Sequence, residues 1–158
     1  MALVLRAADP EERDDLSDLC VRSKAYWGYS RDFLEACRDA LSLSEADMRM
    51  RGLIVAERDT RVAGLAHVMV RRQTASLMRL FVEPSQIGTG IGAVLFDWCV
   101  SESYTRDAAL LDIAADPGAA PFFEHMGALR VGEVASRADA GRTVPHLQFR
   151  LRPRARTV

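Results

Sequence analysis

The sequence has almost no lysine and no excess of either charge. Of its 21 cationic side chains only Lys24 is a lysine, and 22 carboxylates balance them. The resulting formal charge of -1 gives no positive field for nucleic acid and no cationic face for a membrane. We therefore expect no nucleic-acid partner and no membrane association.

Cysteine and histidine are too few and too scattered for a metal site. Cys20, Cys37 and Cys99 each lie in an apolar helical pattern, and the three histidines are far apart in the sequence. No pair of these residues has the spacing of zinc ligands. We predict reduced, buried thiols and no metal, and we interpret His67, which alternates with apolar neighbours, as a structural histidine.

Long apolar runs and targeting signals are also absent. No window reaches the ~18 consecutive apolar residues of a membrane-spanning helix, and the first residues lack the features of a signal peptide. The expected location is therefore cytoplasmic. With 158 residues and 49% hydrophobic side chains, the chain can form one globular domain. We assign residues 1–153 to that domain and residues 154–158 to a frayed, arginine-rich tail.

The hydrophobic pattern alternates between the period of helices and that of strands. Helices are expected to begin near Asp9, at Ser30, after a glycine-rich turn and at Pro121. The expected strands span residues 3–6, 53–57, 62–70, 76–82, 109–114, 131–135 and 147–151. The order βααβββαβαββ predicts a fold of the α/β (α+β) class, with a mixed, largely antiparallel twisted sheet flanked by helices.

One glycine-rich turn between a strand and a helix can bind an anion. Gly88, Gly90 and Gly92 alternate there, so backbone amides at the positive end of the helix dipole are open to a phosphate or pyrophosphate. A plain tight turn is the alternative. The segment has no lysine, which excludes a Walker loop, and its distance from the strand disfavours a Rossmann site.

This turn resembles the acyl-CoA-binding motif of the GNAT superfamily of N-acyltransferases. Residues 116–128, Asp-Pro-Gly-Ala-Ala-Pro-Phe-Phe-Glu-His-Met-Gly-Ala, are similar to the second signature of that family. Spacing and element order agree over residues 50–150. The resemblance implies a splayed strand pair that forms an acyl-CoA groove, with acetyl-CoA or another acyl-CoA as co-substrate and no metal.

The resemblance also implies roles for single residues. The main chain of Leu80 and Val82 would bind the pantetheine arm, and the Val82 amide would act as the oxyanion donor in catalysis. The remaining cofactor-binding residues would be Ile87, Gly88, Thr89, Gly90, Ile91, Gly92, Asp116 and Phe123. The expected substrate-binding residues are Trp27, Tyr29, Arg79, Arg142 and His146.

Structural alternatives stay open at the substrate end. Trp27 and Tyr29 could form a hydrophobic plug between two helices. Arg79 could be solvated or paired, and Arg142 and His146 could cap a loop.

Several positions depart from the family pattern. Ile87 precedes the first glycine in place of Arg or Gln, and Asp116 replaces the usual Asn. Phe123 stands where many members have the Tyr that protonates the leaving thiolate, and Ser76 stands about where some members carry a Glu base. Glu83, the only carboxylate beside the expected thioester, is the candidate base, and an ordinary surface residue is the alternative.

The resemblance thus implies an enzyme, an acyl-CoA-dependent N-acyltransferase. It would move an acetyl group from acetyl-CoA to a primary amine of a small molecule or peptide by direct attack. The alternative is a non-catalytic acyl-CoA-binding or regulatory module with the same fold, which the missing tyrosine favours. The acceptor, the acyl-chain preference and the oligomeric state are left open, a homodimer included.

Overall fold

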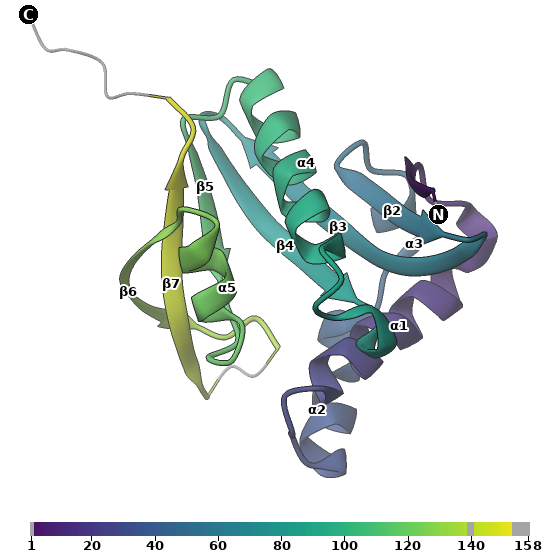
Figure 1. The fold of residues 1–158 in the computed structure, drawn as a ribbon. Coiled ribbons are helices and arrows are strands. Elements are labelled where there is room, and N and C mark those ends of the chain that lie inside the picture. The colour runs from purple at the N-terminus through teal and green to yellow at the C-terminus, as the bar shows by residue number, and fades with distance from the viewer. Residues whose placement is uncertain (1, 139–140, 153–158) are drawn as a thin grey trace, which may run out of the picture.

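One mixed sheet organises the molecule (Figure 1). The computed structural model describes residues 2–138 and 141–152, so the tail predicted at 154–158 lies outside the described residues. The strand order is β1-β2-β3-β4-β5-β7-β6, and only the β4–β5 pair is parallel. The strands are β1 (Leu3–Arg6), β2 (Leu53–Arg58), β3 (Arg61–Arg71), β4 (Thr74–Val82), β5 (Leu110–Ala114), β6 (Leu129–Ala135) and β7 (Thr143–Arg150). The predicted fold class is confirmed.

Helices cover both faces of this sheet. The helices are α1 (Arg13–Ala25), α2 (Arg31–Leu41), α3 (Glu45–Met48), α4 (Ile91–Thr105) and α5 (Ala120–His125), with short 3-10 turns η1 (Pro10–Glu12) and η2 (Pro84–Gln86). Helices α1 and α2 share one apolar cluster with β2 and β3, whereas α4 and α5 share a second cluster with β4 and β5. Within the described residues, no helix is long and apolar enough to cross a membrane.

Local sequence determines where the helices begin. Asp9 and Glu12 form the predicted capping box at the N-terminus of η1 and α1. The Ser30 hydroxyl accepts from the amide of Phe33 and caps α2, also as predicted. The sequence pattern predicts that α4 buries the stripe Ile91, Val94, Leu95, Trp98 and Cys99, and this was wrong at one position: Val94 is 37% exposed, and Phe96, outside the stripe, is buried instead.

The three cysteines lie in these apolar clusters. Cys20 of α1 and Cys37 of α2 are buried between these helices and the sheet, and Cys99 of α4 is buried on the opposite face of the sheet. Burial raises the pKa of Cys20 and of Cys99 to about 12. Both thiols are therefore protonated at neutral pH.

The predicted splay between β4 and β5 is present (Figure 1). The two strands pair only from Thr74–Leu110 to Leu77–Ile113, after which β4 continues to Val82 without a partner in β5. A bulge at Met78 coincides with this point, since the β3–β4 register shifts there. The bulge bends β4 and opens the sheet.

Candidate functional site

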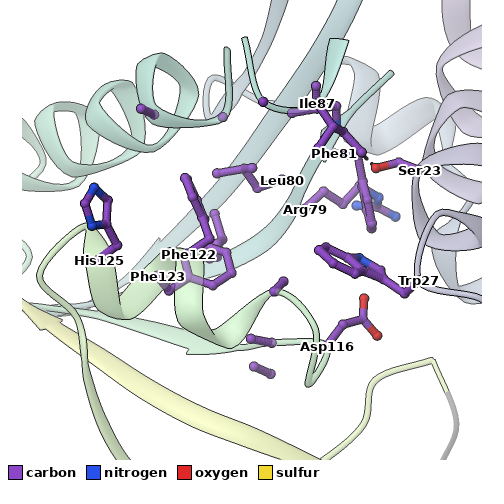
Figure 2. Close-up of a pocket in the computed structure, with 18 of the residues that line it drawn as sticks. Ser23, Trp27, Arg79, Leu80, Phe81, Ile87, Asp116, Phe122, Phe123 and His125 are labelled. Atoms are coloured by element: carbon purple, nitrogen blue, oxygen red, sulfur yellow. Dashed lines mark hydrogen bonds between the residues drawn. The ribbon is translucent and has the colours of Figure 1, made fainter. Parts of the chain in front are cut away.

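A cavity of about 560 Å³ occupies the gap between the parted strands. Ser23 of α1 and Trp27, in the turn after α1, line one side, and Phe122 and Phe123 of α5 line the other (Figure 2). The cavity therefore reaches both faces of the sheet. Its volume lies in the range of small-molecule and cofactor sites.

The glycine turn forms one end of this cavity. Gly88 and Gly90 have φ values of +86° and +93°, a left-handed conformation that favours glycine. Helix α4 begins directly afterwards without a side-chain cap, so its first amides have no acceptor inside the helix. A Cβ added at Gly90 would meet nothing within 4 Å, so the turn is open to a ligand. This end can hold the phosphates of a nucleotide cofactor.

Most of the predicted cofactor-binding residues surround the cavity. Its lining includes Leu80, Val82, Ile87, Gly88, Gly90, Gly92, Asp116 and Phe123. Two others do not line it. The side chain of Ile91 is fully buried in the core, and the Thr89 hydroxyl donates to the carbonyl of Gln86.

The main chain of β4 turns alternate amides toward the gap. The Glu83 amide donates to the carbonyl of Ala63 in β3 over 2.8 Å, so the neighbouring Val82 amide points the opposite way. There it donates to the Ser23 hydroxyl over 3.2 Å. The Val82 amide, the candidate oxyanion donor, thus faces the cavity while it is bonded to Ser23, a residue that no sequence motif marks.

Glu83, the candidate base from the sequence, points away from the cavity. Arg22 of α1 binds its carboxylate through two hydrogen bonds, Nη2 to Oε2 at 2.8 Å and Nε to Oε1 at 3.0 Å. Glu83 is not among the residues that line the gap. The structure does not bring its carboxylate to the parted strands.

A charged network lies at the opposite end from the glycine turn. Asp116 Oδ1 accepts from Lys24 Nζ at 2.7 Å and from the Tyr29 hydroxyl at 2.9 Å. Arg142 Nη2 donates to the same hydroxyl at 3.1 Å. Lys24 is only 6% exposed, so this ion pair is buried. The network joins α1 to the β5–α5 connection across the gap.

Aromatic rings complete this end. Tyr29 stacks on Phe33 with ring centroids 4.6 Å apart, and burial raises the pKa of its hydroxyl. Trp27 lines the cavity above Asp116 (Figure 2) and packs on Gly118, where an added Cβ would lie 2.5 Å from its ring. Tyr29 and Arg142 contact Asp116 or each other and do not line the cavity themselves.

Arg79 lines the cavity, but its guanidinium is engaged elsewhere. It donates to the carbonyls of Leu41 and Ser42 at the end of α2, at 3.1 and 2.9 Å. A third contact, at 3.0 Å, joins it to Nδ1 of His67. Burial, with the nearby Arg79 charge, lowers the pKa of His67 to about 4. His67 is therefore neutral at pH 7 and belongs to the interior.

His146 lies just outside the cavity, on β7. It stands opposite Ala114, which does line the cavity, and its Nε2 is 3.0 Å from Asp112 Oδ1. Within residues 2–138 and 141–152, no group of three or more His, Cys, Asp or Glu side chains could hold a metal ion.

Sequence reasoning missed several residues at this site. Ser23, Phe122 and His125 line the cavity, and Lys24 pairs with Asp116. Lys24 could have been singled out from the sequence, because it is the only lysine in the chain. Phe122 and His125 lie within residues 116–128, the second signature, although no role was assigned to them, and Ser23 carries no motif that separates it from an ordinary helix residue.

Comparison with known proteins gives a match to one family model and matches to solved structures. Residues 12–142 match the family model described as an acetyltransferase (GNAT) domain. No curated protein matches the sequence.

Solved structures match the fold. The PaiA N-acetyltransferase of Thermoplasma acidophilum, in complex with coenzyme A, is similar at a TM-score of 0.80 and 15% identity, over 95% of this chain and 99% of that one. A GCN5-related N-acetyltransferase of Rhodopseudomonas palustris is similar at a TM-score of 0.77 and 22% identity, over 96% and 97%. At these identities the likeness shows the fold alone.

Proposed function

Because the chain belongs to the GNAT acetyltransferase family, we propose that it transfers an acetyl group from acetyl-CoA to a primary amine of a small molecule or peptide. The observation that supports this most is the cavity between β4 and β5. It has an uncapped glycine turn at one end and passes through the sheet to a second, charged end. A long ligand with phosphates at one end and a reactive group at the other fits this shape.

The proposed binding mode follows from the main-chain groups. The amides at Gly88, Gly90 and Gly92 hold the pyrophosphate, and α4 adds its positive dipole end. The pantetheine arm lies along the unpaired part of β4, where alternate amides face the gap as an added strand would need. The thioester then lies near the point where β4 and β5 part.

The proposed reaction is direct attack of the amine on the thioester carbon. The carbon–nitrogen bond forms, the carbon–sulfur bond breaks, and the thiol of CoA leaves. Orientation of the two substrates can supply about 7–11 kcal/mol of the barrier. The Val82 amide is placed to polarise the carbonyl once the Ser23 hydroxyl gives way to the ligand.

One observation favours a second candidate function, a non-catalytic acyl-CoA-binding module. Phe123 lines the cavity where a proton donor for the thiolate is expected, and its ring has none to give. A thiolate can leave without that help, because the reference pKa of its thiol, about 8.5, makes it a weakly basic leaving group. The missing hydroxyl therefore favours a slow enzyme over an inactive one.

The test separates binding from transfer. Calorimetry with acetyl-CoA, S-acetylpantetheine and NAD measures how much the pyrophosphate contributes to binding affinity. S-acetylpantetheine has the same pantetheine arm and thioester as acetyl-CoA but lacks the pyrophosphate. We expect clear binding of acetyl-CoA, much weaker binding of acetylpantetheine and none of NAD. Release of CoA thiol is then followed against a panel of primary amines: amino acids, polyamines and a short peptide.

Each outcome has one meaning. No binding of acetyl-CoA would contradict the proposed cofactor. Tight binding without thiol release across the panel would favour the non-catalytic module. Release with an acetylated amine identified by mass would support the enzyme.

A further inference from the structure

The reaction proposed above needs a group that removes a proton from the acceptor. A primary amine with a reference pKa near 10 is protonated at neutral pH and cannot attack. Glu83 is bound by Arg22 outside the cavity, and Asp116 is bound by Lys24. Phe123 cannot accept a proton, and His125 lines the cavity on the far side from Trp27 and Asp116 (Figure 2). The base therefore has to come from another part of the site.

We propose that His146 is this base and that Asp112 is its positioning residue, an inference that rests on the proposed acetyl transfer. The imidazole Nε2 lies 3.0 Å from Asp112 Oδ1, and Gln148 donates to the same oxygen at 2.9 Å. An ionised carboxylate only accepts, so Nε2 carries the hydrogen and Nδ1 keeps its lone pair. Nδ1 has no hydrogen bond to any residue that the structure describes.

The pair lies beside the point where β4 and β5 part. Asp112 is opposite Ser76 in the next-to-last pair of those strands, and His146 is opposite Ala114, which lines the cavity. Leu111 and Ile113, on either side of Asp112, are buried in the cluster beneath α4 and α5. By strand alternation the pair faces the other side of the sheet, the side of α1 and α2. The cavity reaches that side as well, through Ser23 and Trp27.

Both side chains are partly open to solvent. The exposed fractions are 28% for His146 and 30% for Asp112, in contrast to the fully buried His67. An acceptor can therefore approach His146 from outside while the acyl donor occupies the gap. This separates the roles of the two faces, the glycine turn for the cofactor and the His146–Asp112 pair for the amine.

The charges around the pair are few. Arg137, from the β6–β7 connection, crosses to β4 and donates to the Leu77 carbonyl at 3.1 Å. Burial lowers the pKa of Arg137, and the Asp112 charge partly opposes this effect. Arg79 of β4 acts on Arg137 in the same direction as burial. On β6 the residue opposite His146 is Gly132, which adds no charge.

The proton balance of the step is complete. The ammonium group of the acceptor gives one proton to Nδ1, and His146 passes it to solvent. The neutral amine attacks the thioester carbon, and the carbon–sulfur bond breaks. The second proton on that nitrogen goes to the departing sulfur through water, which yields the amide and CoA thiol.

The test compares pH profiles of turnover, using the amine from the panel that releases thiol fastest. His146→Gln keeps a donor that can reach Asp112 but has no basic nitrogen. We expect its kcat to fall by about 10²-fold, with loss of the acidic limb of the profile and unchanged acetyl-CoA affinity. Asp112→Asn should lower kcat less. In His146→Ala, added imidazole should restore part of the activity, which it would not do if His146 were only structural.

The outcomes are distinct. A His146→Gln profile with an intact acidic limb, or a loss of acetyl-CoA affinity equal to the loss of kcat, would overturn the assignment. No rescue of His146→Ala by imidazole would overturn it too. No thiol release by the native protein with any amine would contradict the proposed function itself, and the assignment with it.

Discussion

The glycine end of the cavity comes from one run of chain, residues 82–92, whereas the opposite end comes from side chains that are far apart in the sequence. At the glycine end the groups offered to a ligand are main-chain amides. At the other end, Lys24 and Tyr29 meet Asp116 over sequence separations of 92 and 87 residues. Ligand binding at the first end depends on a backbone conformation, whereas at the second end it depends on particular side chains.

The difference concerns what each end can recognise. Amides at a helix N-terminus bind any phosphate that fits, so this end suits a cofactor shared by many proteins. The network of one lysine, one aspartate, one tyrosine and one arginine instead offers charged and polar side chains in a fixed arrangement. Selectivity for the acceptor is therefore expected at the charged end, and four predictions test this division.

The largest expected effect is at the glycine turn. Gly90→Glu places a negative charge where a phosphate would lie, and we expect acetyl-CoA affinity to fall by about 10³-fold or more, roughly 4 kcal/mol. Gly90→Ala is the matched control, since it meets the same left-handed φ of +93° without the charge. Calorimetry measures both variants. Equal affinities for the two would place the phosphate site elsewhere.

The next effect is at the charged end. Lys24→Met leaves Asp116 as an uncompensated carboxylate, with a side chain only 15% exposed. We expect the free energy of unfolding to fall by about 3–4 kcal/mol. Adding Asp116→Asn to this variant should recover part of the loss, because the unpaired charge is then removed. Denaturant unfolding of the single and double variants measures the coupling, and strict additivity would contradict it.

A third effect comes from acid. The pKa of His67 is about 4 in the folded protein and near its reference value of 6.5 when unfolded. As pH falls below 6.5 the unfolded chain binds the proton first, so stability is highest above that pH and is lost toward pH 4. The full change is about 3 kcal/mol.

The measurement is unfolding by urea at intervals between pH 7 and pH 4.5. Glu12 and Asp47, whose carboxyl pKa values are lowered, act below this window. His67→Gln should flatten the dependence of the free energy of unfolding on pH, whatever its effect on overall stability. An equal slope in that variant would show that another group titrates. His67 contacts Arg79, which holds the C-terminal end of α2, so protonation of His67 should disturb that end of the helix first.

The smallest expected effect is at Phe123. Its ring lines the cavity, so Phe123→Tyr places a hydroxyl next to the proposed leaving thiolate. We expect turnover to rise by about tenfold, below the 10²–10⁴-fold typical of an optimised general acid. Acetyl-CoA affinity should stay nearly unchanged. Steady-state kinetics with calorimetry separates the two, and lower turnover at equal affinity would mean that the ring itself matters.

Features encoded within a short stretch of sequence were predictable. The caps at Asp9 and Ser30, the glycine turn and the short helix that starts near Pro121 all depend on neighbours within a few residues. The mixed, largely antiparallel sheet followed from the order of helices and strands along the chain, and its splayed strand pair followed from the family resemblance. The buried face of α4 was predicted only in part. That helix is apolar on most of its surface, so the sequence pattern does not distinguish the exposed Val94 from the buried Phe96.

Contacts between distant segments were beyond the sequence. Glu83 was selected by its place next to the strand, but Arg22, 61 residues earlier, determines where its carboxylate points. Arg79 was predicted to bind the substrate, with a paired arginine as the alternative, and its donors are directed to the end of α2. His146 was selected for the loop beside it, and only the register of β5 and β7 shows that Asp112 lies within reach.

The buried cysteines determine how the reaction can be followed. Disulfide reagents react with thiolates, and the raised pKa of Cys20 and Cys99, with the burial of Cys37, makes the folded protein almost inert to them. A colorimetric disulfide-exchange assay should therefore report CoA release with little background. The same reagent reacts with all three cysteines in an unfolded molecule. A slow extra signal in a destabilised variant would count unfolded protein in the very sample whose turnover is being measured.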